Sequence, residues 1–323
     1  MIKKIGVFTS GGDSPGMNAC IRAVVRTAHH AGISCTGFYR GYEGLIDDHT
    51  IDLTPERVSG IIQRGGTILK SARSQRFMTP EGLQKAVATI KRQVLDGFVM
   101  IGGDGTFKGA LALSEACELA VIGCAGTIDN DLVGTDFTIG YDTAVNTVVE
   151  AIDKIRDTAD SHDRVFVVEV MGRDAGLIAL RSAVASGAEA LLVPEIQDDL
   201  ALLCSKMKTW RKSKSSKIIV VAEGDESGGA LVVAEKIRKD FPEFDLRVSI
   251  LGHIQRGGNP TCMERVNASL VGHHAVKALV AGRKGEMVGI VNKEILFTPF
   301  EKAVKHRQKL DDSLLSLIEI LGT

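Results

Sequence analysis

The sequence predicts an α/β fold made of two Rossmann-like three-layer α/β/α domains with largely parallel sheets. Short apolar runs rich in β-branched residues alternate with helical patterns along the chain. Glycine-bearing turns follow several of these runs, where the backbone must approach another backbone or a ligand closely. A chain of 323 residues is also longer than one ordinary compact domain, which favours two cores.

The short apolar runs are the expected strands, and the amphipathic stretches between them are the expected helices. The strand runs are 5–9, 35–39, 97–101, 120–124, 165–170, 190–193, 218–222 and 248–251. The clearest helical patterns are one that ends at 115 and those at 17–30, 144–158 and 310–321. Strands that alternate with helices in this way form parallel sheets, whose ligands bind beyond the carboxyl ends of the strands.

No linker or repeat separates the two domains, so their boundary is inferred from the glycine positions. The chain is expected to cross into the second domain near Gly140 and to return near His253, in a glycine-rich run. The expected bounds are 1–139 plus about 254–303 for the first domain, and 140–253 plus about 304–323 for the second.

The composition excludes several classes of function. The formal net charge of -1 argues against general nucleic-acid binding, which normally needs a basic surface. Six cysteines without a CxxC pair suit a reducing compartment and argue against a disulfide framework or a zinc knuckle. No apolar stretch approaches the roughly 20 residues that span a membrane, and a glycine loop interrupts the apolar N-terminus too early for a signal peptide. We therefore expect a cytoplasmic protein that binds neither nucleic acid nor membrane.

The first glycine-rich loop, Gly11–Asn18, follows a predicted strand and opens a predicted helix. Its backbone N–H groups and the helix N-terminus favour an anion such as phosphate. The loop lacks both the Lys-Ser/Thr ending of a Walker motif and the spacing of the GxGxxG fingerprint. On this loop alone, a tight turn without a ligand explains the pattern equally well.

The second loop, Gly102–Thr106, leaves Asp104 on a bare backbone at the end of a strand. The carboxylate can hold Mg²⁺ beside a triphosphate, directly or through water. The alternative is a turn stabilised by the aspartate side chain. Several kinase families, including NAD kinases and lipid kinases, share the motif, so it indicates phosphoryl transfer without naming the acceptor.

The hexapeptide 126–131 places two carboxylates, Asp129 and Asp131, at another strand end. In an extended segment, residues i and i+2 face the same side, so the two side chains are expected to share one pocket. One would take a proton from an attacking hydroxyl, and the other would hold metal or orient its neighbours. A surface turn is the alternative, and the metal candidate Asp104 on the preceding strand argues against it.

Together these motifs resemble those of the bacterial ATP-dependent phosphofructokinases, and the resemblance runs from Lys3 to about residue 300. It rests on motifs in a fixed order, at 11–18, 64–67, 71–73, 102–105, 126–131, 134–136, 170–173 and 251–258. The resemblance implies a glycolytic, Mg²⁺-dependent kinase that transfers the γ-phosphoryl of ATP to the 1-hydroxyl of fructose 6-phosphate. It also implies that the first domain binds ATP and that the second binds the sugar.

The resemblance assigns roles to individual residues of this chain. Asp129 would be the catalytic base, Asp104 would hold Mg²⁺, and Thr127 and Arg173 would stabilise charge on the transferring phosphoryl group. ATP would contact Gly11, Arg73, Ser74, Gly102, Gly103, Asp104, Gly105 and Thr106. Fructose 6-phosphate would contact Thr127, Ile128, Asp129, Arg164, Met171, Gly172, Arg173, Glu223, Arg247, His253, Ile254, Gln255 and Arg256.

Four of these residues would form a cationic cage around the 6-phosphate, namely Arg164, Arg247, His253 and Arg256. Arginine suits this role because its planar fork meets phosphate oxygens bidentately. For any one arginine, a solvated surface charge is the alternative. In this family the counterparts of Arg164 and Arg247 come from a neighbouring subunit, which implies a homotetramer with shared active sites.

An allosteric site for ADP or phosphoenolpyruvate is also implied. The matching positions are Arg22, Arg26, Arg156, Glu189, Lys212 and Lys214. Arg22 and Arg26 are spaced i, i+4, so they share one helix face, as a common phosphate would require. Pro55 stands where the family has an arginine, with Arg57 two residues on, so this cage is expected to be weakened or rearranged.

The closest alternative is a pyrophosphate-dependent phosphofructokinase. In that group an aspartate usually follows the glycine-aspartate pair and a lysine precedes Thr-Ile-Asp. Here Gly105 and Gly126 hold these positions and are expected to leave room for the α-phosphate and the adenosine. Ala125 in place of a proline and Lys108 in place of a neutral residue depart from the ATP-dependent pattern. A NAD kinase, a dinucleotide-binding oxidoreductase and a non-catalytic sensor on the same fold each explain fewer of the motifs.

Overall fold

The computed structural model describes residues 2–208, 210, 216–304 and 309–322, and contacts between residues divide the chain into two compact units. The first unit comprises Met1–Ile128, Leu132–Thr143 and Arg256–His306. The second comprises Asp129–Asp131, Ala144–Gln255 and Arg307–Thr323. The short segment 129–131 therefore packs with the second unit although the chain on either side of it belongs to the first.

The sheet of the first unit has the strand order β12-β11-β5-β4-β1-β2-β3, with β6 paired to β5. Neighbouring strands are parallel except in the pairs β2–β3 and β11–β12. The strands are β1 (Lys4–Thr9), β2 (Ser34–Phe38), β3 (Thr50–Asp52), β4 (Gly97–Gly102), β5 (Ala120–Thr127), β6 (Ile139–Gly140), β11 (Glu286–Val291) and β12 (Glu294–Pro299).

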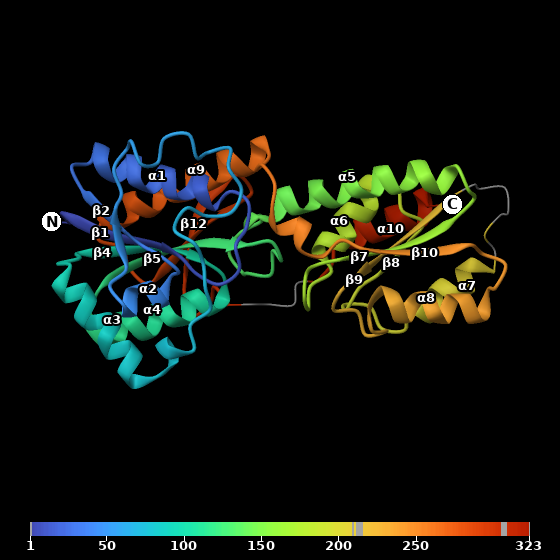
Figure 1. Ribbon diagram of the computed structural model, residues 1–323, viewed down its shortest axis with the longest axis horizontal. Helices are drawn as coiled ribbons and strands as arrows, with labels where there is room; N and C mark the ends of the chain where they lie inside the picture. The colour runs from blue at the N-terminus through green and yellow to red at the C-terminus, as the bar shows by residue number, and fades with distance from the viewer. Residues whose placement is uncertain (1, 209, 211–215, 305–308, 323) are drawn as a thin grey trace. The chain divides into compact units, whose positions relative to one another are not determined.

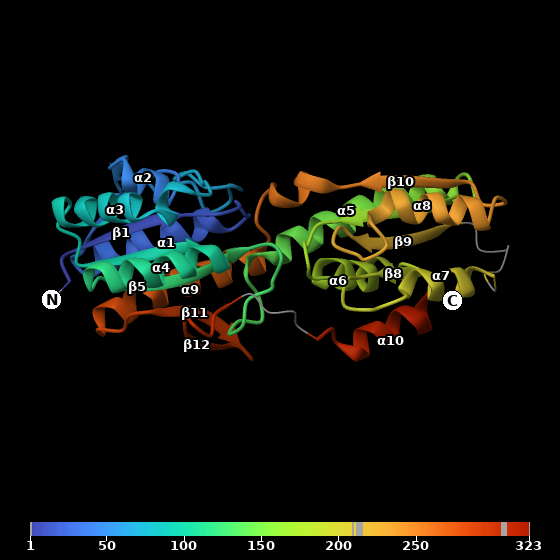
Figure 2. The ribbon, with the colours of Figure 1, turned by 90° about the horizontal axis from the view of Figure 1, so that it is seen from below.

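Helices cover both faces of this sheet (Figures 1 and 2). On one face lie α1 (Met17–His30) and α9 (Cys262–Val280), and on the other lie α2 (Tyr42–Ile46), α3 (Pro80–Arg92) and α4 (Asp104–Cys117). Successive side chains of a strand point to opposite faces. Val99 of β4 is accordingly buried in the α1–α9 core, while Phe98 and Met100 are buried on the α3–α4 side. Burial on both faces explains why these strands read as continuous apolar runs.

The sheet of the second unit has the order β10-β7-β9-β8 and is parallel throughout. Its strands are β7 (Val165–Val170), β8 (Ala190–Leu192), β9 (Lys217–Ala222) and β10 (Leu246–Ile250). Figure 1 shows helices on both faces. One face is covered by α5 (Tyr141–Asp160), α6 (Leu177–Ser186) and α10 (Asp312–Leu321), and the other by α7 (Asp199–Met207) and α8 (Gly229–Asp240).

The predicted fold class is confirmed, and the expected strands form within about two residues of their predicted bounds, except that β5 runs to Thr127, three residues beyond its predicted end. The sequence analysis missed the antiparallel hairpin of β11 and β12. Its turn residues, Asn292 and Lys293, both have positive φ, as the tight turns of hairpins require. No helix within the described part of the chain is long and apolar enough to cross a membrane.

Candidate active site

The carboxyl ends of β1, β4 and β5 lie side by side in the first unit, because these strands are parallel neighbours. The backbone N–H of Ser10 donates to Ile101 O at 3.0 Å, which joins the loop after β1 to the end of β4. Thr106 adds a second link from α4, through its hydroxyl to Ser10 O at 3.4 Å. The two glycine loops predicted to bind phosphate therefore adjoin each other.

The glycines of the loop after β4 serve two different purposes. A Cβ on Gly102 would lie 2.3 Å from Thr106 Oγ1 and 2.6 Å from Ser10 O, so packing excludes a side chain there. A Cβ on Gly105 would meet no atom within 4 Å. The bare backbone at Gly105 is therefore not explained by packing, and it leaves room for a ligand.

Gly126 differs from Gly105 in this respect. A Cβ on Gly126 would lie 3.0 Å from Met17 Cε and 3.2 Å from Gly102 N. Its lack of a side chain is explained by close packing against the neighbouring strand and α1. Gly105, unlike Gly126, therefore lacks a side chain without any packing reason.

Asp104 begins α4 beside this open backbone, and its Oδ2 lies 2.7 Å from the ammonium of Lys108. Within the described residues there is no group of three or more histidine, cysteine and acidic side chains that could hold a metal. Mg²⁺ usually keeps several waters and takes one or two carboxylates together with substrate phosphates. One carboxylate beside an open loop fits that kind of Mg²⁺ site.

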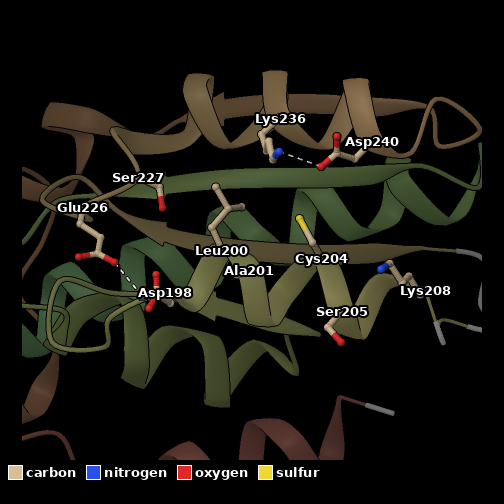
Figure 3. A pocket seen from close by; sticks show the side chains of 10 residues that line it. All are labelled: Asp198, Leu200, Ala201, Cys204, Ser205, Lys208, Glu226, Ser227, Lys236 and Asp240. Carbon is tan, nitrogen blue, oxygen red and sulfur yellow. Dashed lines mark hydrogen bonds and ion pairs between the residues drawn. The ribbon is translucent and has the colours of Figure 1, made fainter.

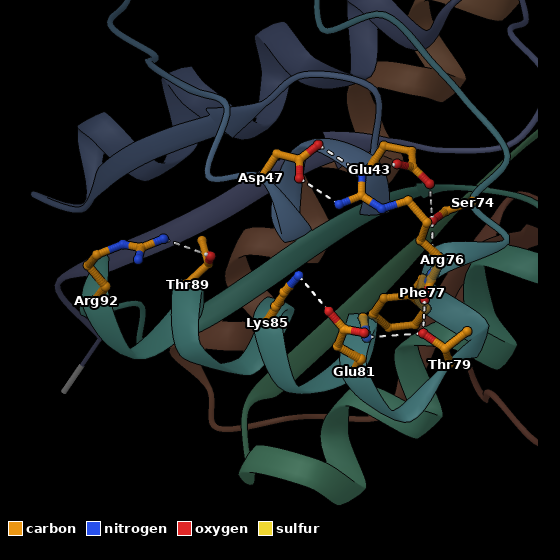
Figure 4. A network of polar contacts seen from close by, with 11 residues as sticks. Glu43, Asp47, Ser74, Arg76, Phe77, Thr79, Glu81, Lys85, Thr89 and Arg92 are labelled. Atoms are coloured by element: carbon orange, nitrogen blue, oxygen red, sulfur yellow. Dashed lines mark hydrogen bonds and ion pairs between the residues drawn. The ribbon is translucent and has the colours of Figure 1, made fainter.

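Arg73 and Ser74 lie on a segment that contacts the first glycine loop (Gly11 N to Ala72 O, 3.2 Å). The Ser74 hydroxyl already bonds Glu43 and accepts from Phe77 N at 3.0 Å, as Figure 4 shows. In this structure Ser74 therefore orders the local turn, whereas Arg73 is exposed.

Arg256 belongs to the first unit by its contacts, although it was predicted to bind the sugar phosphate. Its Nη1 donates to Asp13 O at 3.2 Å. A Cβ on Gly12 would lie 2.5 Å from the same Nη1. The structure therefore brings this guanidinium to the first glycine loop, and a side chain larger than that of glycine at position 12 would displace it.

In the second unit, the carboxyl ends of β7, β9 and β10 carry the predicted sugar-site residues. Glu223 follows β9, and its Oε1 accepts from Gly172 N at 3.3 Å and from Arg173 N at 2.9 Å. Gln255, in the 3-10 turn after β10, accepts from Met171 N at 3.2 Å. Side chains from two strand ends thus hold the backbone of the loop that follows β7.

Asp129, the predicted base, is buried at 4% exposure, and its Oδ2 lies 3.8 Å from Arg173 Nε. The structure therefore brings together two of the three predicted catalytic residues. The segment 129–131 is not extended as predicted, because Asn130 has a φ of +54° and interrupts the strand geometry. Asp131 is also buried, at 6% exposure, but the alternation of side chains does not place it beside Asp129.

Arg164 and Arg247 lie at the opposite end of the second sheet from Met171. Arg164 directly precedes β7, whereas Met171 directly follows it. Both guanidinium groups bind Asp245, Arg164 at 2.7 Å and Arg247 at 2.7 Å. With a rise of about 3.3 Å per residue, the strand separates Arg164 from Met171 by roughly 20 Å, so one sugar phosphate cannot contact both in a single chain.

The predicted effector residues are divided between the two units. Arg22 and Arg26 lie on α1 in the first unit. In the second unit, Arg156 of α5 lies 3.5 Å from the buried carboxylate of Glu189 and donates to Ser186 O at 2.9 Å. Lys212 and Lys214 lie outside the described residues.

Sequence reasoning missed a set of carboxylates that brace the loops of the second unit. Each accepts a backbone N–H at 2.8–2.9 Å, from its own loop in the case of Asp225 and from another loop position or a helix start in the other cases. They are Glu169, Glu195, Asp199, Asp225 and Glu226. Little in the sequence indicates that these acids hold loops, because acidic residues near the ends of strands are also common in solvent-exposed turns.

Comparison with known proteins gives one consistent result. A family model described as Phosphofructokinase matches residues 4–279. ATP-dependent 6-phosphofructokinase 2 of Bacteroides thetaiotaomicron is 50% identical over 99% of both chains. ATP-dependent 6-phosphofructokinase 1 of Thermus thermophilus is 53% identical over 99% of this chain and 100% of its own. A solved phosphofructokinase from Saccharomyces cerevisiae superposes with a TM-score of 0.86 at 35% identity, over 99% of this chain and 47% of that one. With matches of this extent, the chain belongs to the phosphofructokinase family.

Proposed function

We propose that the protein is an ATP-dependent 6-phosphofructokinase, which converts fructose 6-phosphate and ATP into fructose 1,6-bisphosphate and ADP. The observation that carries the proposal is the buried carboxylate of Asp129 beside Arg173, both within the second unit. The name shared by the full-length relatives, at 50% and 53% identity, supports ATP over pyrophosphate as donor. The open backbone at Gly105 supports the same choice.

The chemistry follows from the charges of these groups. Asp129 takes the proton of the attacking 1-hydroxyl, since a base must lie within hydrogen-bond reach of that group. Arg173, and Thr127 at the end of β5, stabilise the negative charge on the transferring phosphoryl group. Asp104 would hold Mg²⁺, which would neutralise charge on the nucleotide phosphates. The first unit is assigned to ATP and the second to the sugar.

The remaining sugar contacts come from two sources. Within one chain, Ile128, Met171, Gly172, Glu223 and the segment 253–256 are assigned to fructose 6-phosphate. Arg164 and Arg247 lie too far from Met171 to reach the same sugar, which supports their delivery from a second copy. We therefore propose a homotetramer whose active sites are shared between subunits.

Regulation by ADP or phosphoenolpyruvate is a second part of the proposal. Arg22 and Arg26 are assigned to one half of the effector site, and Arg156, Glu189, Lys212 and Lys214 to the other. Pro55 stands where the family has an arginine, so the response of the enzyme to ADP or phosphoenolpyruvate is expected to be altered. A cytoplasmic location fits the six unpaired cysteines and a glycolytic role.

The test is an assay of purified protein with fructose 6-phosphate, in which ATP and pyrophosphate are compared side by side. We expect turnover with ATP and Mg²⁺, and a loss of about 10²–10⁴-fold in kcat for Asp129→Ser, the usual contribution of a general base. The melting temperature and the binding of ATP should remain those of the wild type. Turnover with pyrophosphate alone, or an Asp129→Ser variant with full activity, would overturn the proposal.

A further inference from the structure

Two buried carboxylates lie against each other in the second unit. Asp199 begins α7, and Asp225 lies in the loop after β9, each at 5% exposure. Asp199 Oδ2 accepts from Val193 N at 2.8 Å, and Asp225 Oδ1 accepts from Ser227 N at 2.9 Å. The other oxygen of each carboxylate is buried and finds no hydrogen-bond donor among the described residues. The two side chains are within hydrogen-bonding reach of each other.

Two ionised carboxylates in this position would repel each other strongly, because burial removes the water that screens their charges. Burial raises the pKa of Asp199 to about 7; the Val193 N–H opposes this rise and the Asp225 charge adds to it. A single proton removes the repulsion and supplies the missing donor for both orphan oxygens. Similar pairs of close carboxylates are known to hold one proton between them.

The charged groups on the surrounding segments do not offer a better partner. Asp198 N donates to Glu226, and Lys236 is paired with Asp240 at 3.1 Å, as Figure 3 shows. The neighbouring strand-end loops contribute Glu195 and Glu223, which are acidic.

We propose that Asp199 and Asp225 share one proton at weakly acidic pH, which they lose as the solution becomes basic, and that this shared proton positions the Glu223–Arg173 loops of the sugar site. These two carboxylates are then positioning residues, since they act on the substrate only through other groups.

The connection from the pair to the sugar site is short. Asp225 follows Glu223 and Gly224 directly, and a Cβ on Gly224 would lie 1.6 Å from Arg173 O. Glu223 in turn holds the N–H groups of Gly172 and Arg173. A displacement of Asp225 is therefore transmitted to the loop that faces Asp129.

Asp199 acts on the same loop from its other side. It holds Val193 through the backbone N–H, and Val193 packs so closely on Gly176 that a Cβ there would lie 2.4 Å from Val193 Cγ1. Gly176 also donates to Glu195 at 2.8 Å. The shared proton thus joins two supports of one loop, 171–176.

The direction of the pH effect follows from the raised pKa of Asp199. Stability that the proton contributes is fully present below the ordinary aspartate pKa of 3.8 and is lost as the pH rises through about 7. Above that pH the two supports repel each other and the loop 171–176 loosens. Weaker binding of fructose 6-phosphate at high pH follows, and this last step rests on the proposed function.

The experiment compares the wild type with Asp225→Asn and Asp199→Asn across pH 6 to 8. Either amide can donate to the remaining carboxylate, which restores the contact without a titrating proton. In the wild type we expect KM for fructose 6-phosphate to rise about fivefold or more, the lower end of ordinary coupling between sites. In the two asparagine variants, the part of the rise in KM that comes from the carboxylate pair should disappear. Ionisation of the substrate phosphate is common to all the proteins, so it cancels in the comparison.

An infrared spectrum tests the shared proton without any substrate. The carbonyl band of a protonated carboxylic acid should be present in the wild type at pH 6, be lost at pH 9, and be absent from both asparagine variants. Glu264 is expected to give a second such band, so the wild-type-minus-variant difference is measured. If this difference band is present but KM does not follow it, the link to the sugar site is wrong, and if there is no turnover at all, the proposed function is wrong.

Glu226→Gln is the matched control. This neighbour also accepts a loop N–H, from Asp198, but it is exposed, whereas Asp199 and Asp225 are buried. Its pH profile and its infrared band should match the wild type. Absence of the band from the wild type, or an equal flattening of the profile in Glu226→Gln, overturns the shared proton. A pair occupied by a metal cation would likewise lack the band.

Discussion

The two units build their strand-end edges by opposite means. In the first unit the loops after β1 and β4 are shaped by residues without side chains, and the backbone at Gly105 is left open. In the second unit the loops after β7 and β9 are held by carboxylates, such as Glu223, that accept backbone N–H groups. The same parallel-sheet architecture thus carries an edge of bare backbone in one unit and an edge of acidic braces in the other.

The difference reflects the charge of the proposed ligands. A triphosphate is bound by free N–H groups and by helix N-termini, so acidic braces beside it would both occupy donors and repel its charge. A sugar offers mostly neutral hydroxyl groups, and its loops can be fixed by carboxylates if arginines such as Arg173 bind the phosphoryl charge. Rigid loops then hold the sugar in the geometry that transfer requires.

The largest expected effect comes from filling the bare edge of the first unit. Gly102→Ala places a methyl group 2.3 Å from Thr106 Oγ1 and 2.6 Å from Ser10 O, and overpacking of this kind costs about 1–3 kcal/mol. Thermal unfolding should show a clearly lower melting temperature, and ATP should bind weakly. Gly105→Ala is the control, because its methyl group meets no atom of the protein. It should keep or raise the melting temperature and lose ATP affinity alone; equal stability losses in the two variants would contradict the distinction between them.

Removing a brace from the second unit tests the other half of the comparison. Glu223→Ala leaves the N–H groups of Gly172 and Arg173 without their acceptor, and an unsatisfied donor costs about 1–3 kcal/mol. KM for fructose 6-phosphate should rise about tenfold, whereas KM for ATP should change less than about twofold.

Glu223→Gln separates bracing from direct contact with the sugar. Both N–H groups donate to one oxygen, Oε1, which glutamine retains. A near-normal KM for fructose 6-phosphate is expected if Glu223 acts as a brace. A loss as large as that of alanine would show that its charge itself matters.

The contrast between the units also explains what the sequence could predict. Strands buried on both faces and glycine-rich turns leave local patterns, so the sheets and the loops at 11–18 and 102–106 were found from the sequence. The resemblance to a family supplied Arg173 and Glu223. Asp199 and Asp225 were missed because an acid after a strand reads as a solvated turn, and only tertiary packing buries it.

Two further predictions failed or changed because backbone geometry depends on contacts far away in the sequence. The positive φ of Asn130 breaks an extended run that the pattern of alternating aspartates had suggested. Gly126 was expected to make room for a ligand, but a Cβ there would lie 3.0 Å from Met17 Cε and 3.2 Å from Gly102 N, so local packing alone explains the glycine. In both cases the local sequence was compatible with two backbones, and packing chose between them.

The first unit also contains a buried acidic side chain, that of Glu264. A variant of this residue tests whether acids that hold loops matter for the sugar only at the strand ends of the second unit. Glu264 of α9 accepts from Thr143 N and from its hydroxyl, each at 3.3 Å, and burial raises its pKa to about 7. Its stabilising effect is full below the ordinary glutamate pKa of 4.5 and is lost as the pH rises through about 7. Glu264→Gln should therefore lose this part of the pH dependence of the melting temperature, a shift of a few degrees.

Glu264→Gln should leave KM for fructose 6-phosphate, and its dependence on pH, unchanged, because the hydrogen bonds that this side chain accepts from Thr143 lie within the first unit. That separates it from Asp225→Asn, which should change both. A Glu264→Gln variant whose melting temperature varies with pH as much as that of the wild type would show that this carboxyl is not protonated in the folded protein.

The smallest expected effect concerns Asp104, the acidic residue at the strand-end edge of the first unit. Lys108 lies 2.7 Å from Asp104, so a Mg²⁺ ion bound at the proposed site would compete with this ammonium for the same carboxylate. The side chain of Lys108 is 65% exposed, and exposed ion pairs contribute only about 0.2–1 kcal/mol, so Lys108→Met should lower the Mg²⁺ concentration for half-maximal ATP binding by at most about fivefold. Titration calorimetry of ATP binding at several Mg²⁺ concentrations measures this directly, with Lys85→Met of the Glu81–Lys85 pair on α3 as the control. If Lys108 instead contacts the nucleotide phosphates, Lys108→Met will weaken ATP binding at every Mg²⁺ concentration, and the bare edge would then depend on a side-chain cation as well as on its backbone.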